Sequence, residues 1–344
     1  MIVQRSIDFR KLWKWSAHHI AWLLLGATAI TLLYKFGLID FYIPWLPVSV
    51  IGTAVAFYVG FKNNAAYDRM WEARKVWGAI VNNSRAWGSY VNNFVSNLFR
   101  KEKISEEDLQ AIKKRLLYRH IGWVYALRNQ LLQVAPWEHA AQRGTIGKTA
   151  KKYQRNDGVG LLDDDITSNA LKRYLPENEY KKLISYKTPA TQIIDYQGKD
   201  LVELRSDYTI DDFRHIELQK ILYSFYENQG AVERIKKFPL PRQYASMSQY
   251  FIGIFLLLMP FSLIPELMKV GSWGIWLSIP ITALIGYVYV MMELIGDYTE
   301  NPFQGMANDI PMLSLSRTIE IDLLEMLGEK ELPQPISSNN GVLL

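Results

Sequence analysis

The sequence predicts an all-α membrane protein with four transmembrane helices and a large helical region in the cytosol. Four stretches of at least twenty residues contain no Asp, Glu, Lys or Arg: Trp15–Tyr34, Phe41–Phe61, Gln243–Pro265 and Val270–Met292. A helix rises about 1.5 Å per residue, so roughly 20 apolar residues cross a hydrocarbon core of about 30 Å. The stretches form two pairs, separated by a polar block from Lys62 to Arg242.

The composition excludes several classes of function. The chain of 344 residues has no cysteine, which rules out disulfides, thiolate metal sites and cysteine nucleophiles. Its five histidines show no paired spacing of metal ligands, and no glycine-rich phosphate loop follows a strand pattern. We therefore expect no cofactor, no metal and no enzymatic activity.

Basic residues border the uncharged stretches and predict the topology. They lie before the first stretch, after the second and before the third: Arg5, Arg10, Lys11, Lys14, Lys62, Arg69, Arg74, Lys75, Arg234, Lys236, Lys237 and Arg242. By the positive-inside rule, both termini and the polar block are cytoplasmic, and the chain is a multi-pass protein of the inner (plasma) membrane. This orientation explains the net charge of +5 without nucleic acid as a partner.

The predicted elements divide the chain into four parts. Residues 1–61 hold an amphipathic segment from Ile2 to Trp15 and the first two spans, residues 62–242 form the cytosolic region, residues 243–292 hold the last two spans, and residues 293–344 form a cytosolic tail. Because residues 61–96 contain no proline, the second span is expected to continue into the cytosol as one long helix.

Within the cytosolic parts, Ser105 and Asp108 resemble a capping box that begins a helix, and Pro136 is expected to end or kink it. Residues 144–165 are expected to form a mobile loop because apolar periodicity is lost there. Helices are expected to resume at 170–174, 211–225 and 316–327. The tail after Pro333 is expected to be disordered.

Two motifs resemble the bestrophin family in its bacterial branch. The segment from Gly60 to Arg85 reads GFKNNAAYDRMWEARKVWGAIVNNSR, and the segment from Glu300 to Glu320 reads ENPFQGMANDIPMLSLSRTIE. The first follows the second span and the second follows the fourth span, as in that family. Together with the span layout, the resemblance covers roughly residues 1 to 328 and is weakest from about 140 to 200.

The resemblance implies a homopentameric ion channel whose second spans surround a central pore with a narrow neck. An ungapped match places Ser49, Thr53 and Phe57 in the neck. Helical spacing alone offers a stripe at Val50, Thr53 or Ala54, Phe57 and Phe61. Packing against neighbouring helices is an equal alternative for each position. Animal and plant members conduct anions, whereas some bacterial members are described as preferring monovalent cations, so the sign of the ion stays open.

Two further pore regions are expected. Asn63 and Asn64 are candidates for the vestibule, since an uncharged amide can solvate either ion sign. The family spacing before Asn228 to Gly230 points to Phe213 and Ile216 as a cytosolic aperture, although core packing is the alternative that we favour at both positions.

The calcium site of animal members is not expected here. Asn301 and Asp309 remain, but Gly305, Met306 and Ala307 replace the acidic cluster, and calcium prefers six to eight oxygen ligands. Asp297, Glu300 and Asp309 are instead expected to contact Arg69, Arg74 or the N-terminal segment. The charge run from Asp68 to Lys75 is expected to pair mostly within its helix.

The sequence therefore predicts passive conduction of monovalent ions, with other copies of the chain, membrane lipid and the permeating ions as partners. A non-conducting membrane scaffold that recruits a soluble partner is the alternative from another class. A secondary transporter is the third possibility, disfavoured because the chain shows no internal repeat.

Overall fold

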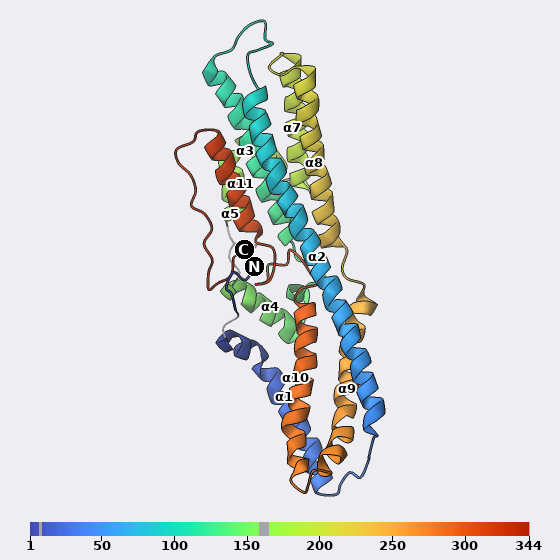
Figure 1. Cartoon of the computed structure of the whole chain (residues 1–344). Coiled ribbons are helices and arrows are strands. Elements are labelled where there is room, and N and C mark those ends of the chain that lie inside the picture. Colours follow the sequence, from blue (N-terminus) through green and yellow to red (C-terminus); the bar gives the residue numbers. More distant parts are fainter. Residues whose placement is uncertain (7–8, 158–164, 344) are drawn as a thin grey trace. The chain divides into compact units, whose positions relative to one another are not determined.

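The computed structural model describes residues 1–6, 9–157 and 165–343, and the described chain is helical with isolated β-bridges in place of strands (Figure 1). The helices, in chain order, are α1 (Phe9–Lys35), α2 (Trp45–Phe94), α3 (Glu106–Leu132), the short 3-10 helix η1 (His139–Ala141), α4 (Gly144–Asp157), α5 (Ile166–Tyr174), α6 (Glu177–Leu183), α7 (Pro189–Ser206), α8 (Asp212–Lys237), α9 (Arg242–Met268), α10 (Gly274–Asp297) and α11 (Met312–Met326).

The chain divides into two compact units, which are described separately. The membrane unit comprises Gln4–Arg69 and Pro239–Asn301, and the polar unit comprises Met1–Val3, Met70–Phe238 and Pro302–Leu344. Helix α2 contributes residues to both, and its 50 residues confirm the single long helix expected from the absence of proline. The predicted positions of the membrane boundaries at 61, 242 and 292 stay a prediction.

The membrane unit contains α1, the first part of α2, α9 and α10, and the four predicted spans are confirmed. Four helices of the described chain are long and apolar enough to cross a membrane, and the third lies within Asp212–Met268, whose apolar part is α9. Helix α10 packs against both α1 and α9. One seam of the unit joins Val55 and Val59 of α2 to Phe255 of α9. Gly52 permits this approach, because a Cβ atom there would lie 2.7 Å from the Phe255 ring.

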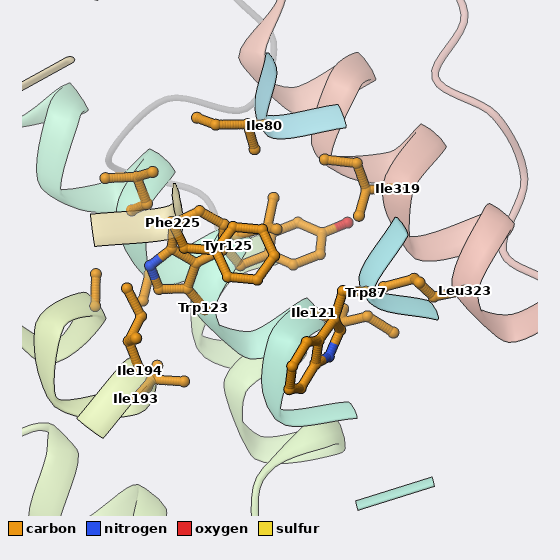
Figure 2. Close-up of a cluster of buried hydrophobic side chains, with 14 of the residues drawn as sticks. Ile80, Trp87, Ile121, Trp123, Tyr125, Ile193, Ile194, Phe225, Ile319 and Leu323 are labelled. Carbon is orange, nitrogen blue, oxygen red and sulfur yellow. The ribbon is translucent and has the colours of Figure 1, made fainter. Parts of the chain in front are cut away.

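The polar unit is built around α3, which is buried along most of its length and packs against α5, α7, α8 and α11. Trp123 lies against Phe225 of α8, and Trp87 of α2 packs edge-on to the same ring (Figure 2). The predicted start of α3 is confirmed, since the Ser105 side chain accepts a hydrogen bond from the Asp108 amide.

Several local expectations for the polar unit are wrong. Residues 144–157 form helix α4 and no loop, and residues 158–164 of that expected loop lie outside the described chain. Helix α3 ends at Leu132, before Pro136, and α6 and α7 were not predicted. The tail is paired with the N-terminus by an antiparallel bridge between Ile2 and Val342. Helix α4 was not predicted because its buried residues, Gly147 and Ala150, are too small to give the sequence a helical pattern of large apolar residues.

Candidate functional site

Helix α2 of the membrane unit has one face covered by its own chain and one face left open. The covered positions recur at the spacing of one helical face and are Val48, Gly52, Val55, Val59, Lys62 and Ala66. The exposed positions lie about half a turn away and are Leu46, Val50, Thr53, Ala54, Phe57, Phe61 and Asn64. The second set, called the open face below, contains no ionisable side chain.

Apolar side chains on the open face are unusually accessible for their type. Val50, Phe57 and Phe61 are 62%, 65% and 64% exposed. Thr53, Phe57 and Phe61 line a hollow of about 480 Å³, together with Ala56, Gly60, Asn64 and Tyr289. The other helices of the described chain therefore leave these side chains largely uncovered, and packing against helices of further protein stays the alternative.

The two hydroxyl residues of the predicted neck use their hydroxyl groups locally. The Ser49 hydroxyl donates to the Leu46 carbonyl at 2.8 Å, and the Thr53 hydroxyl donates to the Ser49 carbonyl at 3.0 Å. Ser49 is half-buried, whereas Thr53 is exposed. Because the Thr53 hydroxyl bonds to its own helix, the open face is less polar than its sequence suggests.

Asn63 and Asn64, the two predicted vestibule residues, lie in different surroundings. The Asn63 amide donates to the Met292 carbonyl of α10 at 2.9 Å, so this side chain fastens α2 to α10. Asn64 is exposed and lines the same hollow as Phe57 and Phe61. Within the membrane unit, therefore, Asn64 belongs to the open face and Asn63 does not.

A buried ion pair holds α2 in place directly behind the open face. The Lys62 ammonium lies 2.5 Å from Glu293 Oε1 of α10, and its side chain is completely buried. Ser248 of α9 donates to the same carboxylate oxygen at 2.9 Å and lies 3.3 Å from the ammonium. Sequence reasoning missed this site because it treats Lys62 only as a basic residue that sets the topology and does not single out Glu293. Their position at corresponding ends of two spans was the available signal.

Phe213 and Ile216, the predicted aperture residues, lie near the start of α8 in the polar unit. Asp211 caps this helix by accepting hydrogen bonds from the amides of Phe213 and Arg214 at 2.8 and 3.0 Å. Phe213 is 82% exposed and Ile216 is 51% exposed. The core packing that we favoured for both is therefore wrong within the chain.

Two acidic residues after the fourth span have partners in addition to those expected, and Asp309 also interacts electrostatically with the amino terminus at Met1, as expected for the N-terminal segment. Asp309 accepts hydrogen bonds from the amides of Phe303, Gly305 and Ile310 at 2.7 to 2.9 Å, and Glu300 pairs with Arg242 at 2.9 Å. Burial raises the pKa of Asp309 above its ordinary value, although the three amides lower it. Among the described residues, no three His, Asp or Glu side chains are arranged to hold a metal ion.

The charge run on α2 also pairs differently from the expected ladder. Glu72 accepts a hydrogen bond from Arg234 of α8 at 2.7 Å, so it links two helices of the polar unit.

A buried ion pair lies at the end of α8. Lys236 of α8 pairs with the buried carboxylate of Glu138 and lies 3.3 Å from the Phe303 carbonyl. Burial raises the pKa of Glu138, while the nearby Lys236 lowers it. These pairs fix helix ends of the polar unit.

The fold and this site define a polytopic α-helical membrane protein whose second spanning helix presents an open, uncharged face. The model of the bacterial and fungal bestrophin family matches residues 12–325. The chain therefore belongs to the bestrophin family, as its two motifs indicated.

Curated relatives and solved structures agree with this assignment. The Escherichia coli K12 protein named voltage-dependent anion channel-forming protein YneE is 26% identical over 84% of this chain and 79% of its own. A similarly named protein of Mesorhizobium japonicum is 28% identical over 82% of this chain and 75% of its own. A solved bestrophin homologue from Klebsiella pneumoniae superposes with a TM-score of 0.73 at 21% identity, covering 92% of this chain and 99% of that one.

Proposed function

We propose that this protein is a homopentameric channel that passes monovalent ions passively through a pore lined by the open face of α2. The observation that carries the proposal is the accessibility of Phe57 and Phe61 in the single chain. An exposed apolar face on a spanning helix is covered by lipid, by further protein or by a water-filled pore. The hollow beside Phe57 and the exposed amide of Asn64 favour the pore.

The chemistry of this face supports an apolar neck that conducts without binding ions tightly. In a pentamer, each position of α2 would contribute five copies of its side chain to a ring. Rings of Val50, Phe57 and Phe61 would constrict the pore with apolar surface, which gates by excluding water. Thr53 would add little polarity because its hydroxyl bonds to the Ser49 carbonyl. Ser49 is the less favoured neck position, since it is half-buried.

The remaining steps of the path follow from the other accessible residues. Asn64 would begin a polar vestibule below the neck, and Phe213 with Ile216 would form a second apolar ring near the exit. The protein would lie in the bacterial inner membrane, with both termini in the cytoplasm, as the basic residues around the spans favour.

We favour anions as the permeating ions, with chloride as the example, because the curated relatives carry names that state anion conduction. The open face itself contributes no charge that would set the sign. Selectivity would therefore depend on pore width and on the polar groups beyond the neck.

The deciding experiment is the reversal potential of the purified protein in a planar bilayer under asymmetric potassium chloride. For a tenfold gradient, the current through a selective channel reverses at about 59 mV from zero. The sign of this potential is opposite for chloride and potassium selectivity. A value near the chloride potential supports the proposal in full, and one near the potassium potential replaces anions with monovalent cations.

Two other outcomes would reject the channel. Absence of current and of ion flux from loaded liposomes would favour the non-conducting scaffold. Flux that saturates and requires a coupled substrate would favour a secondary transporter.

Variants of α2 then test which residues line the pore. Phe57→Ala and Phe61→Ala should change the conductance, whereas Val59→Ala on the covered face should conduct normally.

A further inference from the structure

Helix α4 of the polar unit carries a basic face that has no role in the proposed pore. Lys148, Lys151, Lys152 and Arg155 recur at the spacing of one helical face and are all exposed. They line a hollow of about 470 Å³ between them. No Asp or Glu occurs in the sequence from residue 139 to residue 156.

The packing of α4 fixes the direction in which this basic face points. Ala150 is 1% exposed and Gly147 is also buried, so the side of the helix opposite the cations lies against the protein. Helix α4 packs against η1, and the Gln154 amide donates to the Gln304 carbonyl at 2.7 Å. The cations are therefore held outward by the fold and do not turn freely with the helix.

The four cations are not neutralised by the parts of the chain that the structure describes. None of them makes an ion pair or a side-chain hydrogen bond with a described residue. Other basic residues of the polar unit are paired, such as the buried Arg119 with Glu179 and Asp200. Four neighbouring unpaired cations repel one another, so an anionic partner would relieve that repulsion.

Chain connectivity ties the surroundings of α4 to the ends of two spans. Gln304, which binds α4, follows the last residue of α10 by seven residues, and seven residues reach at most about 25 Å. Glu138, next to η1, pairs with Lys236, which precedes the first residue of α9 by six residues. Only a short length of chain therefore separates each partner of α4 or η1 from the last residue of α10 or the first residue of α9.

We propose that the basic face of α4 binds the headgroups of anionic phospholipids. Lys and Arg donate charge-assisted hydrogen bonds to phosphate oxygens, and a lipid surface offers several phosphates at once to four aligned cations. The binding would anchor the polar unit to the bilayer and make the protein sensitive to lipid composition. This proposal does not depend on ion conduction.

The test uses the full-length protein in lipid nanodiscs with one fluorophore on α4. Since the chain has no cysteine, Thr149→Cys provides a unique labelling position on the exposed side of the helix. Quenching by a nitroxide attached to a small fraction of the lipid headgroups reports contact with the bilayer surface. The discs contain phosphatidylcholine with an increasing fraction of phosphatidylglycerol.

Matched variants separate this face from general charge effects. The test variant carries Lys148→Gln, Lys151→Gln, Lys152→Gln and Arg155→Gln. The control variant removes four exposed cations elsewhere in the polar unit, Lys101, Lys103, Lys182 and Lys187, again by change to Gln. The two proteins have the same net charge, and each is compared by its melting temperature to verify folding.

The expected result is quenching that rises with phosphatidylglycerol in the wild type and the control. Each basic residue near an anionic surface strengthens binding about fivefold, so loss of all four should weaken binding by more than about a hundredfold and leave the test variant with little quenching at any phosphatidylglycerol fraction. Wild-type quenching should also fall at 1 M salt, where the Debye length is about 3 Å.

Three results would overturn the proposal. The first is equal quenching in the test variant and the wild type. The second is quenching that does not depend on phosphatidylglycerol or on salt. The third is a response of the fluorophore to inorganic phosphate in phosphatidylcholine discs that matches the lipid response, which would assign the site to a soluble phosphate. None of these results would bear on ion conduction.

Discussion

Removing the charge of Lys62 should destabilise the membrane unit far more than removing an exposed lysine. The Lys62 side chain is completely buried, and its ammonium lies 2.5 Å from Glu293 and 3.3 Å from Ser248. In Lys62→Met, the Glu293 carboxylate would stay buried with Ser248 as its remaining donor in this cluster. Loss of one partner from a buried ion pair costs about 3–5 kcal/mol, because the other charge is left without compensation.

The double replacement Lys62→Met with Glu293→Met should recover most of this loss. Replacing both partners of a buried pair by apolar side chains is often neutral or stabilising, since no charge is then desolvated. Thermal unfolding of the purified protein in one detergent provides the comparison. The wild type and the double variant should melt at similar temperatures, and both single variants should melt well below them.

An exposed ion pair serves as the control for this series. Lys181 and Glu177 are four residues apart, and their side chains are 69% and 80% exposed. Exposed pairs contribute about 0–1 kcal/mol, so Lys181→Met should melt close to the wild type. If Lys62→Met melts no lower than Lys181→Met, or if the double variant melts below both single variants, the pair does not hold α2 in the way argued above.

Three further perturbations test other parts of the structure. Phe57→Ala should increase single-channel conductance because it widens an apolar ring, and unchanged conductance would remove Phe57 from the pore lining. Gly88→Val should cost about 1–3 kcal/mol by overpacking, since a Cβ atom there would lie 2.5 Å from the Met326 sulfur, and an unchanged melting temperature would contradict this close approach of Met326 to Gly88. Burial lowers the pKa of His120 to about 3, so the unfolded chain binds more protons than the folded chain once the pH falls below about 6.5. The free energy of unfolding should therefore fall by about 1.6 kcal/mol between pH 6.5 and pH 5, and His120→Gln should remove that part of the pH dependence.

The long-range organisation of the protein could be predicted from the sequence because it depends on the length of the uncharged stretches and on local chemistry. Four uncharged stretches are long enough to span a bilayer, and the absence of proline after Phe61 allows α2 to continue to Phe94. Ser105 marks the start of α3 because its side chain satisfies a backbone donor there. Each of these signals acts over a few residues or within one helix, where the sequence is sufficient.

The errors occurred where a helix is fixed by packing and not by its own pattern. Helix α4 buries Gly147 and Ala150, which are too small to produce an apolar period. Phe213, for which core packing is the favoured expectation, is exposed in the first turn of α8, just after the Asp211 cap. A residue type alone does not specify which side of a helix meets its neighbours.

The sequence by itself determined the class of protein and its four spans, because four uncharged stretches are long enough to cross a bilayer. The absence of proline after Phe61 indicated the continuity of α2, and two extended motifs indicated the family. Only the tertiary structure decided which residues of α2 are open, because that depends on where α9 and α10 cover the helix. Lys62 and Phe61 are neighbours in the chain, but a helix turns by about 100° per residue. One is therefore buried beside Glu293 and the other is 64% exposed on the face that we assign to the pore.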